Sequence, residues 1–199
     1  RGPDQDAEPR LRADARRNRA RILAVAMEAF AAEGLSVPVQ EIARRAGVGT
    51  GTVSRHFPTK EALFEAILLS RAGGLTQEAT RLLEAAGPGA AFFEFFALVI
   101  AEGAANLGLA EALTGAGYDL DAAARRDGVD PMTALGLLLA RAQRAGAVRP
   151  DVEVPDVKAL IGGCLARLAG PADPAALDRM VSIARHGLQS EADAGQADH

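Results

Sequence analysis

Polar and basic side chains capable of binding DNA are concentrated in one short stretch of the sequence, TGTVSRHFPTK at 50–60. Hydroxyl, imidazole and guanidinium groups can hydrogen-bond both base edges and phosphates. A glycine lets the backbone approach a phosphate closely, and a lysine can contact one as a point charge. The stretch therefore predicts a DNA-reading surface formed by Thr50, Gly51, Thr52, Ser54, Arg55, His56 and Lys60.

The residues around this stretch can form the corner that would present it to DNA. In VQEIARRAGVGTGTVSRHFP (39–58), the small Ala43 allows two helices to cross closely, and Gly47 tolerates the positive φ of a sharp turn. Apolar side chains would fill the space between the helices: Ile42, Ala46, Val48 and Val53. This spacing is typical of a helix-turn-helix, whose second helix enters the major groove. An ordinary helical hairpin with a polar outer face is the alternative for the spacing by itself.

Helical periodicity continues through the rest of the chain, which is 49% hydrophobic and contains no tryptophan. Alanine and leucine dominate the long segments, and this mixture favours helix over strand. We therefore expect an all-α fold of about nine helices. They are predicted at 10–33, after Pro38, at 50–57, from Thr59 to about 86, at 90–106, 107–114, 122–146 (broken or unbroken at Gly128 to Pro131), 156–169 and 174–188.

The charge changes sign along the chain. Residues 10–60 have a net charge of +6, and residues 61–199 have a net charge of −8. A basic module on an acidic body directs one end of a protein toward DNA, whereas the overall charge of −4 argues against indiscriminate binding. The predicted organisation is a disordered arm (1–9), a three-helix DNA-binding domain (10–60), a helical regulatory and dimerisation domain (61–189) and a disordered tail (190–199).

Several protein classes are disfavoured by the sequence. The single cysteine, Cys164, excludes an intramolecular disulfide framework and a cysteine-based zinc site, and we expect it to be a packed core residue. The apolar runs look too short and too often interrupted for a membrane span, and the charged start of the chain lacks the apolar segment of a signal peptide. We therefore expect a cytoplasmic protein with no metal or cofactor.

The sequence also lacks the motifs of common enzymes. We find no glycine-rich phosphate loop, no H-E-x-x-H, no paired acids and no nucleophile elbow, and His186 and His199 have no evident partner. We predict that the chain is not an enzyme. An enzyme that borrows the fold is one alternative, and an interaction protein that no longer reads DNA is another.

Residues 16–68 resemble the DNA-binding domain of the TetR family of bacterial regulators. The matching segments are RILAVAMEAFAAEG and EIARRAGVGTGTVSRHFPTKEALFEAI, and the run HFPTKEAL is the most specific part. The resemblance implies an all-helical, Ω-shaped homodimer and assigns DNA contacts to the same seven residues. Two departures affect those contacts. Ser54 stands where members often have tyrosine, and Val37 and Pro38 replace the usual capping threonine or serine.

The segments at 106–113 and 140–163 resemble the SbtR-like C-terminal domain of some family members. This resemblance implies that the last two helices pair with their twofold mates in a four-helix bundle. The apolar positions suited to such an interface are Leu160, Ile161, Leu165, Leu168, Leu177, Met180, Val181, Ile183, Ala184 and Leu188. Gly162 and Gly163 would permit close approach of two helices. The same stripes could instead face the core of one protomer.

The sequence gives only a weak indication of a ligand pocket. Four phenylalanines at 92, 93, 95 and 96 cannot share one helix face, so some of them could line a cavity. The candidate lining is Phe92, Phe96, Glu102, Asn106, Tyr118, Leu135, Leu139 and Arg167. Simple core packing of the aromatic rings is the alternative.

Together these features predict a ligand-responsive repressor. We expect a homodimer that binds a palindromic operator with recognition helices roughly 34–36 Å apart. A small, apolar effector would release it from DNA, and there is no membrane partner. Activation instead of repression stays open at this point.

Overall fold

The computed structural model describes residues 7–171, 173 and 175–190. These residues form ten helices and no strand, and Val148 and Gln189 make an isolated antiparallel bridge. The helices are α1 (Ala7–Glu33), α2 (Val39–Arg45), α3 (Thr50–His56), α4 (Lys60–Ala85), α5 (Pro88–Ala105), α6 (Leu107–Gly115), α7 (Leu120–Arg126), α8 (Pro131–Arg144), α9 (Val154–Leu168) and α10 (Ala176–Leu188). The prediction of an all-α fold is confirmed.

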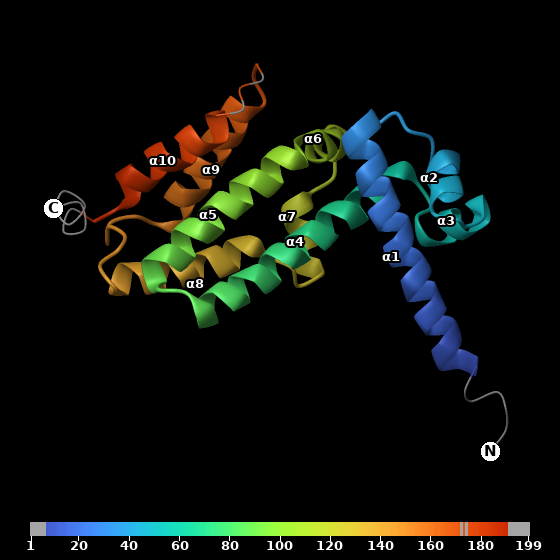
Figure 1. Cartoon of the computed structure of the whole chain (residues 1–199), viewed down its shortest axis with the longest axis horizontal. Helices are drawn as coiled ribbons and strands as arrows, with labels where there is room; N and C mark the ends of the chain where they lie inside the picture. Colours follow the sequence, from blue (N-terminus) through green and yellow to red (C-terminus); the bar gives the residue numbers. More distant parts are fainter. Residues whose placement is uncertain (1–6, 172, 174, 191–199) are drawn as a thin grey trace.

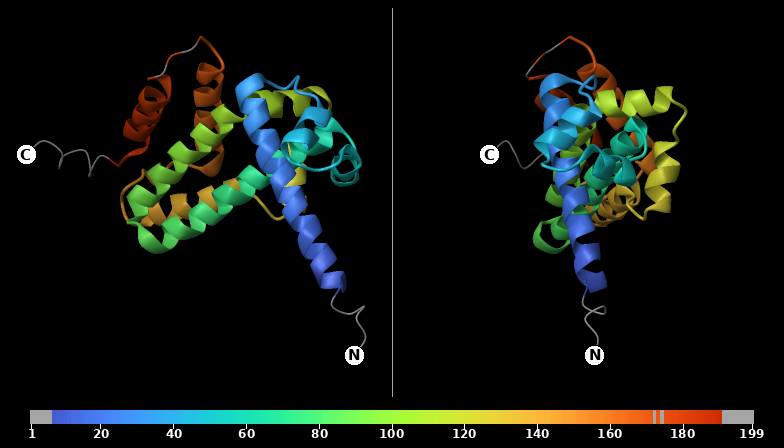
Figure 2. Two further views of the ribbon diagram at one scale, coloured as in Figure 1. Left: turned by 45° about the vertical axis from the view of Figure 1, so that its right-hand side comes forward. Right: turned by 90° about the vertical axis from the view of Figure 1, so that its right-hand side faces the viewer.

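Two hydrophobic clusters divide the molecule (Figure 1). The first lies among α1, α2, α3, the start of α4 and α6, and the second lies among α4, α5, α8, α9 and α10. Helix α4 belongs to both, so it connects the three-helix unit to the body, as the left-hand view of Figure 2 shows. The predicted arm at 1–9 is partly helical, because α1 begins at Ala7 and proline is tolerated in a first helical turn. Residues 1–6 and 191–199 lie outside the described part of the chain.

The corner between α2 and α3 is built as the sequence indicates. Gly47 has a φ of +64°, its N–H donates to the Arg44 carbonyl at 3.2 Å, and the N–H of Val48 donates to the Ala43 carbonyl at 3.1 Å. This is a Schellman arrangement, in which a left-handed residue satisfies the last carbonyls of a helix. Ala43 is 1% exposed, so the two helices meet through a small side chain.

Alanine substitution at Gly47 tests this corner, and the same substitution at Gly74 in α4 is the control. A Cβ added at either position meets no atom within 4 Å, but only Gly47 has a positive φ. We expect Gly47→Ala to lower the free energy of unfolding by about 1–2 kcal/mol, because alanine is strained there. Gly74→Ala, inside α4, should raise it by about 0.5–1 kcal/mol through helix propensity. Urea unfolding of both variants measures these values, and two shifts of the same sign would contradict the prediction.

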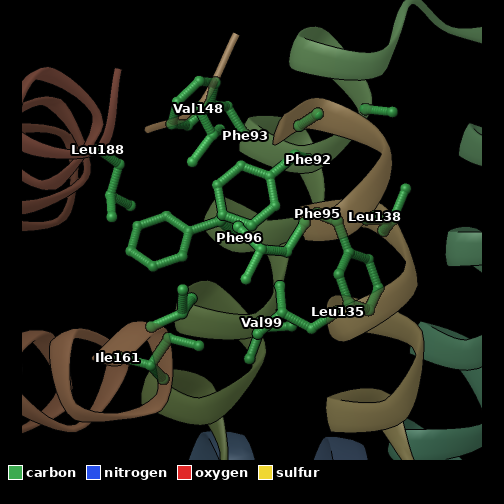
Figure 3. Packing of buried hydrophobic residues seen from close by; sticks show 14 of the residues in the cluster. Phe92, Phe93, Phe95, Phe96, Val99, Leu135, Leu138, Val148, Ile161 and Leu188 are labelled. Carbon is green, nitrogen blue, oxygen red and sulfur yellow. The ribbon is translucent and has the colours of Figure 1, made fainter. Parts of the chain in front are cut away.

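Helix α5 forms the centre of the body (Figure 3). Phe92, Phe93, Phe95 and Phe96 are all buried, because α4, α8, α9 and α10 surround the helix on several sides. The rings of Phe92 and Phe93 meet edge to face, with centroids 5.1 Å apart. By length and composition α5 is the one described helix that could cross a membrane, contrary to our expectation that no run was long enough. Its place in the core accounts for that composition.

The segment predicted at 122–146 is two helices, which explains why ten form instead of nine. Gly128, with a φ of +68°, ends α7. Asp130 then caps α8 by accepting a hydrogen bond from the N–H of Met132 at 3.0 Å, and Pro131 occupies the first helical position. Proline there starts a helix well but cannot continue one from before it. The break that the sequence left open is therefore present.

Candidate nucleic-acid interface and ligand cavity

Helix α3 turns its polar side outward. Thr50, Gly51, Ser54 and Arg55 are exposed, whereas Val53 is fully buried against α1 and α2. The remaining predicted DNA contacts, Thr52, His56 and Lys60, are half-buried at the edges of the same face. Six of the seven residues thus lie in α3, and Lys60 is the first residue of α4. A polar helix face of this kind can enter a major groove.

The segment after α3 holds the recognition face in place. Phe57 is buried, and the Thr59 hydroxyl accepts a hydrogen bond from the N–H of Ala62 at 3.1 Å. This bond caps the first turn of α4. No side chain caps α2 at Pro38, which agrees with the departure noted in the sequence.

Two cations lie over aromatic rings beside this face. The Lys60 ammonium is 5.7 Å from the centroid of the Phe30 ring and 5.9 Å from that of Phe64. The Arg19 guanidinium lies 5.3 Å from the centroid of the Phe57 ring. Such contacts hold the long side chains while their charged ends stay near solvent. Lys60 is the first residue of α4, so its positive charge lies close to α3.

An ion-pair cluster joins α1 to α2. The Glu41 carboxylate accepts hydrogen bonds from Arg44 at 2.8 and 2.7 Å and from Arg45 at 2.7 Å. Arg45 also donates to Glu33 at the end of α1, at 3.0 Å. The hydrogen bonds from Arg44 and then Arg45 lower the pKa of Glu41 to about 2. The cluster fixes the approach of α2 to α1 and uses no side chain of α3.

This cluster predicts a specific response to acid. The pKa of Glu41 in the folded chain lies below its ordinary value of 4.5, so the pair stabilises the fold above about pH 4.5. That contribution is lost as the pH falls from about 4.5 to about 2. We expect the free energy of unfolding of the wild type to exceed that of Glu41→Gln at about pH 6, and this difference to shrink at about pH 3. Urea unfolding at both pH values checks it, and a difference that does not change with pH would count against the cluster.

Comparison with known proteins identifies the family. Residues 22–67 match the model of bacterial regulatory proteins of the tetR family, and residues 87–190, just over half of the chain, match the SbtR-like C-terminal domain of transcriptional regulators. The chain belongs to the TetR family. A TetR-family regulator from Mycobacterium vanbaalenii is 49% identical, with a TM-score of 0.71, over 90% of this chain and 99% of that one.

Other TetR-family relatives support the same assignment. A regulator from Streptomyces coelicolor is 32% identical, with a TM-score of 0.71, over 87% of this chain and 99% of that one. The HTH-type transcriptional regulator TtgW of Pseudomonas putida is 42% identical over 60 residues. That match covers 30% of this chain and 45% of TtgW. Both resemblances found in the sequence, including the SbtR-like C-terminal domain, are confirmed.

The TetR-family body contains a cavity of about 370 Å³. Its wall comes from α4, α5, α6, α7, α8 and α9 and is largely apolar. The apolar side chains are Leu68, Leu69, Ala72, Leu75, Val99, Ala110, Leu120, Ala124, Pro131, Met132, Ile161 and Leu165. A cavity of this size and composition suits a small, mostly apolar molecule.

Only part of the predicted pocket lies at this cavity. Glu102 and Asn106 line it, but the other six candidates do not. Phe92, Phe96, Leu135 and Leu139 are buried in the core, because the faces of α5 and α8 that carry them pack against neighbouring helices. Tyr118 is 38% exposed, and Arg167 forms an ion pair with Asp173 at 3.1 Å.

The polar groups of the cavity wall are mostly paired with one another. Asn106 donates to the Glu102 carboxylate at 3.3 Å, Arg71 lies 3.8 Å from that carboxylate, and Lys158 lies 3.1 Å from Asp121. The sequence analysis did not predict Arg71 and Lys158 as residues of the cavity wall. Arg71 could have been found, because it lies at helical spacing from Leu68, Ala72 and Leu75, which line the same cavity.

Burial raises the pKa of Asp130, another wall residue. The hydrogen bonds from Thr133 and the N–H of Met132, together with the charge of Arg125, outweigh this effect and leave the pKa below its ordinary value. The Asp130 carboxylate is therefore held charged at the start of α8. Among the described residues, no cluster of histidine, cysteine or carboxylate side chains could hold a metal ion.

The predicted dimer residues divide between a buried and an open side. Ile161, Ala184 and Leu188 lie in the core of the protomer, and Leu165, Leu168, Leu177, Met180 and Val181 pack partly against it. Leu160 and Ile183 are 38% and 66% exposed. Of the positions expected at a dimer interface, Leu160 and Ile183 therefore lie on the open faces of α9 and α10, and the others lie in or against the core of the protomer. The sequence could not separate the two sets, because an inward stripe and a partner-facing stripe have the same spacing.

Proposed function

We propose that this TetR-family regulator is a ligand-responsive repressor that binds a palindromic operator as a homodimer in the cytoplasm. The observation that carries the proposal is the exposed polar face of α3, anchored from behind by the buried Val53. In a dimer, two such helices about 34–36 Å apart would enter successive major grooves. The seven predicted DNA contacts remain part of this proposal.

The open side of α9 and α10 supports a homodimer. Leu160 and Ile183 are large apolar side chains exposed to solvent, and Gly162 and Gly163 offer a flat, exposed surface on α9. Pairing these helices with their twofold mates would bury the apolar groups and set the spacing of the two recognition helices.

The cavity supports release by a small, largely apolar molecule. Helix α4 contributes five residues to its wall, from Leu68 to Leu75, and the same helix packs against the three-helix unit through Leu63 and Ile67. A ligand that prefers a differently spread dimer would shift the population away from DNA. DNA must then weaken binding of that ligand by the same factor.

Operator binding is tested first. The full chain is used to select palindromic sites from random duplex DNA, and its affinity for the selected site is measured from about 50 to 200 mM salt. We expect dimeric binding that falls steeply with salt, because several phosphates are contacted. A monomer in sedimentation analysis, or an affinity insensitive to salt, would contradict the proposal.

Effector binding is tested with a cavity-filling variant. Ala124 lines the cavity, so the indole ring of Ala124→Trp should occupy part of it and obstruct a ligand. In a thermal-shift screen of small apolar compounds, an effector should raise the Tm of the wild type and leave the Tm of Ala124→Trp unchanged. The same compound should weaken operator binding by the wild type but not by Ala124→Trp. Equal responses of both proteins would place the effector elsewhere.

A further inference from the structure

The first half of α1 extends beyond the part of the molecule that it helps to build. Among the side chains of α1 that the structure describes, which begin at Ala13, the first buried one is that of Ile22, and none from Ala13 to Arg21 is buried. From Ala7 to Arg21 the helix is about 22 Å long at 1.5 Å per residue. Figure 1 and the right-hand view of Figure 2 show this half projecting past α2 and α3.

This projecting half of α1 is strongly basic. The sequence from 10 to 21 contains six arginines and one acidic residue, Asp14, whereas the acidic residues Asp4, Asp6 and Glu8 precede it. Burial in a core would cost such charged side chains their hydration, and none of the described side chains from Ala13 to Arg21 is buried. The high positive charge of this segment is therefore not needed to build the hydrophobic core of the protomer.

Two contacts lie within the basic half of α1, and a third links this half to the segment after α3. Asp14 forms an ion pair with Arg17, and the Asn18 side chain accepts a hydrogen bond from Arg21 at 3.1 Å. The Arg19 guanidinium lies over the ring of Phe57, the residue that directly follows α3. The basic half thus continues the proposed DNA-binding surface, at the end of the molecule opposite α8 and α10 (Figure 1).

We propose that this half of α1 is a second DNA contact, which binds backbone phosphates flanking the base pairs read by α3. Duplex DNA carries one negative charge per roughly 1.7 Å, so an arm about 22 Å long can lie beside on the order of a dozen phosphates. The planar guanidinium matches phosphate geometry. Contacts of this kind add affinity without sequence preference. The inference rests on the operator binding proposed above.

The test compares two charge-matched double variants of the full chain. Arg17→Gln with Arg21→Gln removes two charges from the arm, and Arg81→Gln with Arg144→Gln removes two exposed charges from the body. Glutamine retains good helix propensity. Each protein is titrated with the selected operator in two forms, one with about ten extra base pairs on each side and one trimmed to the recognised pairs.

We expect the arm variant to bind the long duplex roughly tenfold more weakly than the wild type. Its plot of log affinity against log salt should be shallower by about 0.9 for every phosphate that the arm no longer neutralises. On the trimmed duplex the arm variant and the wild type should agree, and the body variant should match the wild type on both. Equal salt slopes of arm variant and wild type on the long duplex would overturn the inference.

A lysine variant separates charge from structure. Arg17→Lys with Arg21→Lys keeps the charge, so it should retain most of the salt slope of the wild type. If its slope is as shallow as that of the glutamine variant, the arm acts by shaping the helix and the proposal is wrong. Failure of operator binding itself is distinguishable, because the wild type would then show no preference for the selected site over a scrambled duplex. That result would overturn both proposals.

Discussion

Replacing Arg55 by alanine is expected to weaken operator binding by about 100-fold to 10,000-fold. Arg55 is exposed on the outer face of α3, so each half-site would lose a charge-assisted hydrogen bond of about 1.5–3 kcal/mol, and a dimer carries two of them. Fluorescence anisotropy with the selected operator measures the loss. Because the side chain is exposed, the free energy of unfolding should stay within about 0.5 kcal/mol of the wild type.

Arg144→Ala is the matched control for this experiment. Arg144 is exposed in the last turn of α8 and donates to the Ala140 carbonyl of its own helix at 3.1 Å. Its removal deletes the same charge far from α3 and should change operator affinity less than about threefold. If Arg55→Ala combined with Lys60→Ala also left the affinity unchanged, the chain would be an interaction protein that no longer reads DNA.

Replacing Phe96 by alanine is expected to lower the free energy of unfolding by about 3–5 kcal/mol. The ring is fully buried and stacks on that of Phe92 with centroids 6.3 Å apart. Removal would leave a cavity in the hydrophobic cluster around α5, and close packing of the neighbouring helices prevents it from collapsing easily. Urea unfolding at one fixed protomer concentration measures the effect, since dimerisation adds to apparent stability.

This prediction also separates the two roles that the sequence allowed for Phe96. Leu137→Ala on α8 is the control, because that side chain is 59% exposed and its loss should cost less than about 0.5 kcal/mol. A similarly small loss for Phe96→Ala would mean that the ring lines a ligand site and contributes little to the core.

Local signals in the sequence predicted the three-helix unit well. The hydroxyl of Thr59 and the left-handed turn at Gly47 act within a few residues of chain, so their types and spacing are sufficient evidence. The outward face of α3 follows from the burial of Val53 in the same way. These features depend on short-range geometry that one helix or turn determines.

The cavity and the open faces of α9 and α10 could not be predicted in the same way. The cavity wall combines residues from six helices, from Leu68 to Leu165, so it depends on how the whole body packs. Phe92 and Phe96 were plausible wall residues only because the sequence does not show that α5 is enclosed on several sides. Ile161 and Leu160 are neighbours in sequence, yet only Leu160 faces solvent.

The most direct test of the central claim is dimethyl sulfate protection on the selected operator, because this reagent methylates guanine N7 in the major groove and adenine N3 in the minor groove. If α3 reads DNA as proposed, the wild type protects guanine N7 at two positions about one helical turn apart, roughly 34–36 Å. Arg55→Ala should lose that protection. Protection confined to adenine N3, or guanine protection that Arg55→Ala retains in full, would contradict the account.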